Sequence, residues 1–351
     1  MTDTSAIRRS PSLPLLIIAS GCAIAMLSFG PRSAMGFFQL PMLADKGWDR
    51  TTFGLAMALQ NLAWGVGQPF FGALADKFGT WRVLALSGLI YAAGLVIMAL
   101  APSPLWLHMG GGILVGLGVA SASFSIILAA FARNVAPEQR SLAFGIGTAA
   151  GSAGMFVFAP LGQGLIDAFG WSEALLWMAA LMLLVPLLGI PLRGNSSSGS
   201  QPRDAFAQTA SEALREALGH RSYVLLVIGF FVCGFHVAFI TVHLPPYIAD
   251  LGLDPAWGAT AIALIGLCNI AGSLLSGYIS GRYSKPIFLS LIYLGRAVAI
   301  FAFMSRSKVE RIRPEDPKAI TFDDYWGQPN LKRLVRQWLG LLSDRAQFVE
   351  M

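Results

Sequence analysis

The sequence predicts an all-α membrane protein, and three observations support this class. Hydrophobic residues make up 55% of the 351 residues and charged residues only 13%, about half the charged fraction of an ordinary soluble domain. The apolar residues gather into long runs, each close to the roughly 20 residues that a helix needs to cross a bilayer. Strands that do not close into a barrel would leave backbone groups unpaired in lipid, so the runs are predicted to be helices.

Nine apolar runs of sufficient length follow one another along the chain. They cover residues 13–40, 52–74, 83–100, 105–131, 142–166, 174–192, 223–248, 257–279 and 287–304. Gly and Ala recur at close spacing in many of them, as in 110–118. Because such small residues let helix backbones approach closely, the runs are predicted to pack into bundles.

A polar segment, 193–221, divides the nine runs into six and three. It begins with several Ser and Gly residues and continues into an amphipathic stretch at 205–218, as is typical of a flexible linker. We therefore expect a cytoplasmic tail at 1–12, an N-terminal six-helix bundle at 13–192, a cytoplasmic linker at 193–221, an incomplete three-helix C-terminal bundle at 222–304 and a polar non-membrane tail at 305–351.

The Lys and Arg residues of the loops predict the orientation in the membrane. If the nine runs alternate, the basic loops fall on one side and the mostly acidic loops on the other. The positive-inside rule then places the N-terminus in the cytoplasm of a multi-pass protein of the inner or plasma membrane.

The net charge of +6 is spread over short loops. Since no basic stripe forms, nucleic acid is not expected as a partner.

Landmarks of the first six runs return later in the chain at a nearly constant offset. The Leu-Pro pair at 40–41 corresponds to the pair at 244–245, and Gly72 corresponds to Gly277. Two halves in the same order and orientation, joined by a cytoplasmic linker, indicate a parallel repeat about an axis along the membrane normal.

A short charged hinge, residues 72–82, joins the second and third runs and reads Gly-Ala-Leu-Ala-Asp-Lys-Phe-Gly-Thr-Trp-Arg. It resembles the signature between the second and third helices of the major facilitator superfamily, which usually reads Gly-x-Leu-Ala-Asp-Arg-x-Gly-Arg-Arg/Lys-x. Thr80 and Trp81 depart from the usual basic pair. The resemblance implies the major facilitator fold and a secondary active transporter that works by alternating access.

In that family the hinge charges bond across the cytoplasmic face and stabilise one access state. The resemblance therefore implies a gating motif formed by Gly72, Asp76, Lys77, Gly79 and Arg82. The alternative is that these charges only fix the topology. That alternative is weak for Asp76, because acidic residues contribute little to topology.

A narrower resemblance, to the monocarboxylate porters and their bacterial relatives, lies in the first run and the loop after it. Phe-Gly-Pro-Arg-Ser at 29–33 and Gly-Trp-Asp-Arg at 47–50 carry it. Those porters have a Lys or Arg after proline in the first helix, and Arg32 matches that position. The resemblance implies that the substrate is a small organic anion, a monocarboxylate. An exporter of drugs or metabolites on the same fold and a non-transporting or defective truncated membrane protein are the alternatives.

Arg32 is the most informative single residue, because a permanent charge inside an apolar run is expensive in lipid and usually faces a cavity or a partner. Its guanidinium fits a carboxylate in a bidentate manner, so we expect it to anchor the substrate carboxylate. The alternative is that the side chain extends to the outer headgroups.

Asn61, His236 and Asn269 are the other candidates for the substrate path. His236 occupies nearly the place of Arg32 in the second half and could exchange protons near neutral pH; a hydrogen-bond donor between helices is the alternative. The amides either line the path or join helices, at about 1 kcal/mol each.

Proton-coupled animal porters carry an Asp and, four residues on, an Arg in the eighth helix. In this sequence Asn269 and Ser273 occupy those two positions, which argues against proton symport through that pair. The proton therefore stays only a candidate co-substrate.

The tail, 305–351, is highly charged and contains no apolar run. The family has twelve helices, so nine runs imply a chain truncated after the ninth helix, by a shifted frame or a broken or fused gene. A genuine module is one alternative, with an amphipathic helix at 331–342 that could lie on a membrane. The other alternative is that the ninth run does not cross the membrane. Nine crossings would place the basic tail outside the cell, against the positive-inside rule, and eight crossings would not.

No constellation of residues points to an enzyme. The carboxylates lie in loops, and the four histidines have no metal-ligand spacing with cysteine or acid. Cys22, Cys233 and Cys268 lie far apart inside apolar runs and are expected to be packing residues. We therefore expect no catalytic residue, metal or cofactor.

Overall fold

The computed structural model describes residues 14–136, 139–193, 210–280 and 283–306, and within these ranges the chain is helical without strands. This confirms the predicted all-α class. The tail at 1–12, most of the linker and residues 307–351 lie outside the described residues. The chain forms two compact units, 1–288 and 289–351.

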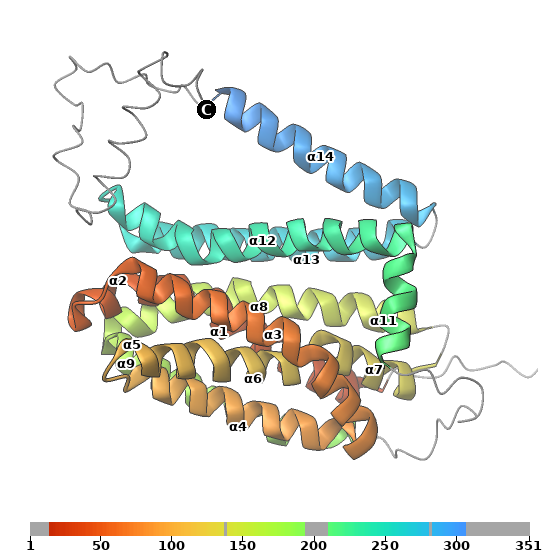
Figure 1. The fold of residues 1–351 in the computed structure, drawn as a ribbon, viewed down its shortest axis with the longest axis horizontal. Helices are drawn as coiled ribbons and strands as arrows, with labels where there is room; N and C mark the ends of the chain where they lie inside the picture. The colour runs from red at the N-terminus through yellow and green to blue at the C-terminus, as the bar shows by residue number, and fades with distance from the viewer. Residues whose placement is uncertain (1–13, 137–138, 194–209, 281–282, 307–351) are drawn as a thin grey trace, which may run out of the picture. The chain divides into compact units, whose positions relative to one another are not determined.

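The helices of the first six predicted runs lie within the first unit (Figure 1). Their bounds are α1 Leu15–Ser33, α2 Met35–Lys46, α3 Arg50–Phe78, α4 Thr80–Ala99, α5 Pro104–Leu107, the π-helix η1 His108–Leu114, α6 Val115–Ser121, α7 Phe124–Asn134, α8 Arg140–Phe169, α9 Trp171–Met182, α10 Val185–Leu188 and the 3-10 helix η3 Ile190–Leu192. Short breaks thus divide the first, fourth and sixth predicted runs.

Four further helices complete the described chain. α11 Ala210–Gly219 lies within the predicted linker, and α12 Arg221–Asp250, α13 Pro255–Ser280 and α14 Lys285–Arg306 come after it. The amphipathic stretch expected at 205–218 contributes α11, and the ninth predicted run extends to Arg306, two residues beyond its expected end at Met304.

Seven segments among the described residues are long and apolar enough to cross a membrane, judged by length and composition alone. They correspond to seven of the nine predicted runs. The other two runs are α3, which carries the amides Gln60, Asn61 and Gln68, and α14, whose apolar part is the shorter stretch Pro286–Ala302.

The first predicted run is broken at Ala34, between α1 and α2. Pro31 lies inside α1, and a proline removes one backbone donor and strains the helix around it. The Ser33 hydroxyl donates to the Gly30 carbonyl at 2.6 Å, and the Ala34 amide donates to the Pro31 carbonyl at 3.1 Å. The break at Ala34 therefore lies two residues after Arg32, at the end of α1.

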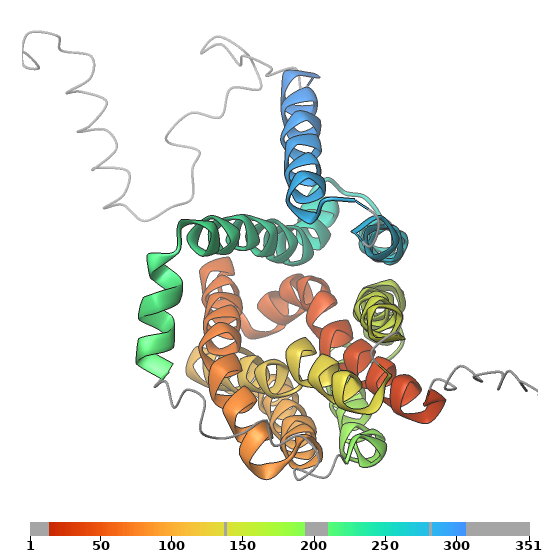
Figure 2. The ribbon, with the colours of Figure 1, turned by 90° about the vertical axis from the view of Figure 1, so that its right-hand side faces the viewer.

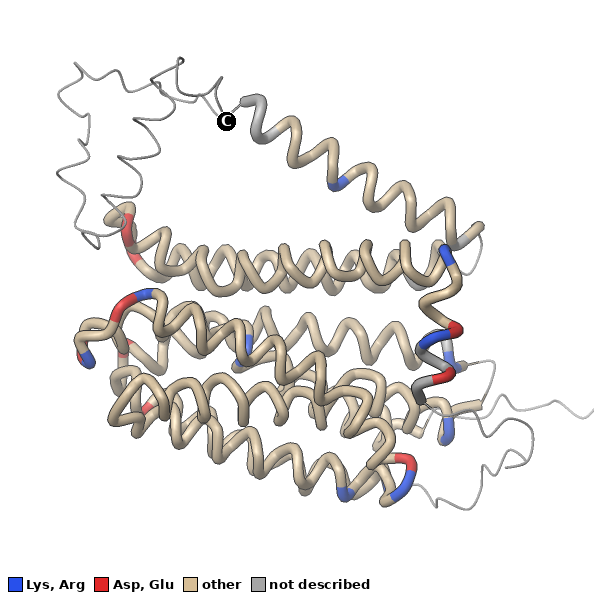
Figure 3. Tube along the Cα trace, viewed as in Figure 1, with Lys and Arg blue, Asp and Glu red and all other residues tan. Residues whose placement is uncertain are grey.

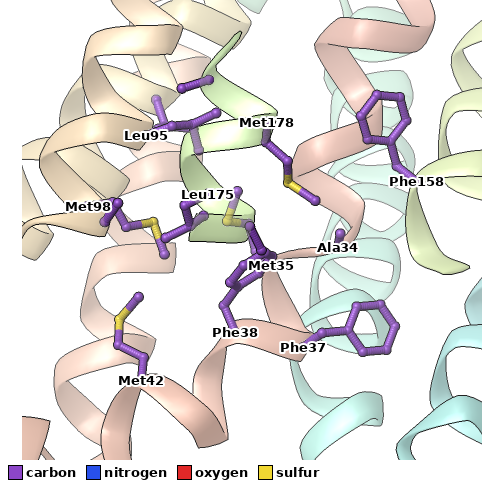
Figure 4. Packing of buried hydrophobic residues seen from close by; sticks show 14 of the residues in the cluster. Ala34, Met35, Phe37, Phe38, Met42, Leu95, Met98, Phe158, Leu175 and Met178 are labelled. Atoms are coloured by element: carbon purple, nitrogen blue, oxygen red, sulfur yellow. The ribbon is translucent and has the colours of Figure 1, made fainter. Parts of the chain in front are cut away.

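The residues around this break form the centre of the apolar core. Ala34, Met35 and Phe38 are fully buried. Figure 4 shows them beside side chains of α4 and α9, including Leu95, Met98, Leu175 and Met178. The break is thus held on several sides by neighbouring helices, which gives Arg32 a fixed backbone position.

Close glycine contacts join α1, α8 and α13 side by side, as the end-on view in Figure 2 shows. A Cβ at Gly154 of α8 would lie 2.7 Å from the Met26 carbonyl of α1, and one at Gly266 of α13 would lie 2.7 Å from the Phe156 amide of α8. Only glycine permits such an approach without displacing a backbone. These contacts attach α13 to the six-helix group of the first half.

Candidate functional site

Arg32 is held from two sides by α3. Its Nη2 donates to the Asn61 Oδ1 at 2.6 Å, and its Cζ lies 4.6 Å from the centroid of the Trp64 ring. Asn61 and Trp64 are three residues apart on α3, so both face the same neighbour. The Asn61 amide is oriented by its own bond, in which Nδ2 donates to the Met57 carbonyl at 2.8 Å.

This contact lies deep along the helices. Arg32 stands between the start of α1 at Leu15 and the end of α2 at Lys46, and Asn61 lies within the 29-residue helix α3. Figure 3 shows that the charged residues of the first unit lie mostly near the helix ends. The bond to Asn61 holds the guanidinium inside the bundle and gives no support to the alternative in which Arg32 extends to the headgroups.

The positive charge of Arg32 has no acidic partner within 4 Å in the described part of the chain. Its Nε is buried and makes no hydrogen bond, and the same holds for the Trp64 Nε1. An uncompensated buried charge is expensive in lipid surroundings. An anion with acceptor oxygens would offset this cost, so the arrangement is suited to bind one.

The other two predicted substrate residues do not contact this cluster in the described structure. His236 is half-buried on α12, its Nδ1 is buried without a hydrogen bond, and its ring lies 6.3 Å from that of Phe235. Asn269 is exposed on α13. Of the four, the structure brings together Arg32 and Asn61 only.

Gln60, next to Asn61, has a different role. It is only 2% exposed, and its Nε2 donates to the Gly111 carbonyl of η1 at 2.8 Å. This is the contact expected of an amide that joins helices. Neighbouring amides on one helix thus point to different partners.

The predicted gating motif lies at the junction of α3 and α4. Gly79 ends α3 with a φ of +89°, a conformation that favours glycine and lets the chain turn within one residue. The side chains of Asp76, Lys77 and Arg82 are exposed. A Cβ at Gly72 would meet no atom within 4 Å. No ion pair joins this motif to another helix among the described residues.

The two residues that depart from the family signature do contact other segments. The Thr80 hydroxyl accepts a hydrogen bond from Nη2 of Arg133. The Trp81 indole donates to the Pro186 carbonyl at 3.1 Å, and the Arg193 Cζ lies 3.9 Å from its ring centroid. Arg133 and Arg193, which are distant in the sequence, therefore contact the two positions where the family usually has a basic pair.

Sequence reasoning missed a second polar contact, between Arg50 and Asp250. Nη1 and Nη2 of Arg50 each donate to one carboxylate oxygen at 2.7 Å. Arg50 begins α3 and Asp250 ends α12, so this ion pair joins the two halves at the end of the bundle opposite Asp76. The available signal was a repeated Ala-Asp-x-Gly sequence, at 44–47 shortly before Arg50 and at 249–252 around Asp250.

Trp64 was also missed, although the signal for it was present. Met57, Asn61, Trp64 and Gln68 recur every three or four residues along α3, which places a tryptophan and two amides on one helix face. That face meets Arg32 in the structure.

Comparisons with known proteins identify the family. The model of the Major Facilitator Superfamily matches residues 16–309. The chain belongs to the Major Facilitator Superfamily. A solved structure of a D-xylose-proton symporter shares its fold with a TM-score of 0.55 at 14% identity, covering 78% of this chain and 70% of that one. The predicted major facilitator fold is thereby confirmed.

Within this superfamily the chain is similar to monocarboxylate transporters. It is 29% identical over 291 residues to monocarboxylate transporter 11 of Mus musculus (80% of this chain, 62% of that one) and 26% identical over 276 residues to monocarboxylate transporter 13 of Bos taurus (78% and 62%). It is 25% identical over 308 residues to the uncharacterized transporter YcxA of Bacillus subtilis (85% and 72%). The match to the mouse and bovine transporters thus spans less than two thirds of their length. The resemblance to the monocarboxylate porters is confirmed.

Proposed function

We propose that this major facilitator protein carries a small organic anion, a monocarboxylate, across the membrane by alternating access. The observation that carries the proposal is the half-buried Arg32, whose Nε is buried and whose guanidinium Asn61 and Trp64 hold in place without neutralising it. Guanidinium and carboxylate form strong paired hydrogen bonds. A substrate carboxylate would supply the charge that the described part of the protein leaves unmatched.

The contacts between the halves support an alternating mechanism. At one end, Arg50 bonds to Asp250, and Gly36 of α2 lies so close to the backbone of Thr241 that a Cβ would collide with it. At the other end, Asp76 and Arg82 are exposed. The structure fits a state in which the halves meet at the Arg50 end. Release of these contacts would accompany the opposite access state.

The orientation follows from the distribution of basic loops. With the N-terminus in the cytoplasm of a plasma or inner membrane, the hinge at Asp76 is cytoplasmic and the Arg50–Asp250 ion pair is external. The relatives named as monocarboxylate transporters support the anionic substrate class. Asn269 and Ser273 offer no acid for proton symport, and His236 is the candidate for proton exchange.

Transport by the purified 351-residue chain in proteoliposomes tests the function. We expect saturable uptake of labelled pyruvate, lactate or propanoate. Arg32→Ala should reduce kcat/KM by about 100-fold, because the loss of a charged hydrogen-bond pair costs about 3 kcal/mol. Arg221→Ala is the matched control, since Arg221 is exposed at the start of α12. Absence of uptake by the unmodified chain, or uptake insensitive to Arg32→Ala, would rule out the proposal.

A further inference from the structure

Two buried nitrogen donors without partners belong to one cluster. They are Nε of Arg32 and Nε1 of Trp64, and the Arg32 Cζ lies 4.6 Å from the Trp64 ring centroid. Both groups can only donate hydrogen bonds, so neither can satisfy the other. A buried indole N–H usually finds a partner. An unpaired one beside an unpaired guanidinium donor therefore calls for an explanation.

Stacking under an arginine does not by itself leave an indole unpaired. Trp81 stands in the same relation to Arg193, whose Cζ lies 3.9 Å from its ring centroid, yet its Nε1 donates to the Pro186 carbonyl. The same chain thus contains one Arg–Trp pair with a satisfied indole and one with a free donor. The free donor is in the pair that lies deep in the bundle.

The Trp64 ring is held in a fixed orientation. Phe29 packs edge-on against it, with ring centroids 5.9 Å apart and an interplanar angle of 79°. Phe29 and Arg32 are one helical turn apart on α1, so α1 contacts Trp64 through both. A donor on a fixed ring keeps its direction before any ligand arrives, which lowers the entropic cost of binding.

We propose that Trp64 contacts the substrate directly, as a second hydrogen-bond donor that acts with Arg32 Nε on one carboxylate. This inference rests on the proposed function and extends it to a residue that binds the substrate and sets its specificity. One carboxylate has two acceptor oxygens, which can accept from both N–H groups. The aromatic rings of Phe29 and Trp64 lie beside these donors.

The same surroundings predict the preferred class of anion. A monocarboxylate with a short apolar body would place its charge on the two donors and its carbon atoms against the rings. A second anionic group on the ligand would meet aromatic surface instead of a donor, and an unpaired charge there is unfavourable. We therefore expect propanoate to bind better than its dicarboxylate analogue succinate.

The test uses the full chain in lipid nanodiscs, with 15N in the indole nitrogens. The sequence has nine tryptophans, and Trp64→Phe assigns the resonance of Trp64. On titration with propanoate we expect a saturable shift of this N–H signal, with little change for Trp81. Propanamide, which lacks the charge, and sodium chloride at equal ionic strength should not reproduce the shift, and Arg32→Ala should abolish it.

Binding of labelled propanoate, measured by equilibrium dialysis, gives the size of the effect. Trp64→Phe keeps an aromatic ring beneath Arg32 and removes only the donor, so we expect the Kd to rise roughly tenfold, as for the loss of one hydrogen bond to a charged group. Trp81→Phe is the matched control and should leave the Kd unchanged.

The outcomes separate this inference from the proposed function. Arg32-dependent binding with an unmoved Trp64 signal, or with the same Kd in Trp64→Phe, overturns the role of Trp64 and leaves transport intact. A saturable Trp64 shift in a chain that transports no monocarboxylate keeps the binding role and rejects the transport function. Absence of propanoate binding to the unmodified chain overturns the role of Trp64, while the uptake assay judges the transport function independently.

Discussion

At the scale of single residues, the proposed function gives Asn61 the role of keeping the charge of Arg32 available to an external anion. It offers a neutral acceptor to one guanidinium nitrogen and so fixes the side chain without neutralising it. Replacement by a carboxylate would complete an internal ion pair in nearly the same volume. The protein would then carry its own competitor for the substrate.

We therefore predict that Asn61→Asp raises the KM for monocarboxylate uptake at least about tenfold, since internal pairing removes the equivalent of one charged hydrogen bond. The Tm should be unchanged or higher. Asn134→Asp is the matched control, because the Asn134 Nδ2 makes the same bond to a carbonyl four residues earlier, at 2.8 Å. An unaltered KM in Asn61→Asp would contradict the assignment of Asn61 to the anion site.

For Gln60 we predict the opposite pattern, an effect on stability without an effect on uptake. Gln60→Leu removes the buried bond to the Gly111 carbonyl and should lower the free energy of unfolding by about 1 kcal/mol. The KM for uptake should stay within about twofold, since Gln60 does not contact Arg32. Thermal unfolding in detergent and the uptake assay measure the two effects. A large change in KM with an unchanged Tm would show that Gln60 acts on the substrate path instead.

At the scale of elements, the contact between α8 and α13 depends on one glycine. A Cβ at Gly266 would lie 2.7 Å from the Phe156 amide and 3.0 Å from the Ser152 carbonyl, both backbone atoms that cannot move aside alone. A Cβ at Gly272 on the same helix would meet nothing within 4 Å. The two glycines lie on the same helix, but only Gly266 is packed closely against a neighbouring helix.

Gly266→Ala is accordingly expected to separate the two helices and to destabilise the protein by about 1–3 kcal/mol, the usual range for overpacking. Gly272→Ala should be neutral or slightly stabilising, because alanine is the better helix former. Unfolding temperatures of the two variants, compared in one detergent, measure the difference. Equal Tm values would mean that the α8–α13 contact is not tight in solution.

At the scale of the whole molecule, the Arg50–Asp250 ion pair links the halves at one end. Both side chains are about half exposed, at 56% and 44%, and exposed ion pairs contribute only about 0.2–1 kcal/mol. Within the proposed alternating mechanism, such a pair can bias two access states by a few-fold and still be released during transport. A weak contact suits the step that this mechanism reverses in every cycle.

We predict that Arg50→Asp shifts the protein towards the state that is open at this end, because two carboxylates would then face each other. The double variant Arg50→Asp with Asp250→Arg should restore the original distribution. Distances between spin labels at Thr51 and Leu253, in a cysteine-free background, report the populations. The shift should weaken at high salt, which screens exposed charges. A failure of the double variant to restore the distribution would argue against a direct pair.

Much of the architecture was predictable from local patterns. The apolar runs locate the helices because the bilayer thickness fixes their length. The hinge at 72–82 indicates the superfamily because its motif is contiguous in the sequence. The breaks after Arg32 and within the fourth run were missed, since continuous hydropathy does not reveal where a helix changes its geometry.

The sequence by itself determined that the protein spans a membrane with several helices, that it resembles the monocarboxylate porters, and that Arg32 is a charge in apolar surroundings. Only the tertiary structure decided what surrounds that charge. Its contacts with Asn61 and Trp64, and the bond between Arg50 and Asp250 across 200 residues, depend on how separate helices pack. Periodicity shows which face of a helix is polar, and the partner of that face is set by packing between segments far apart in the chain.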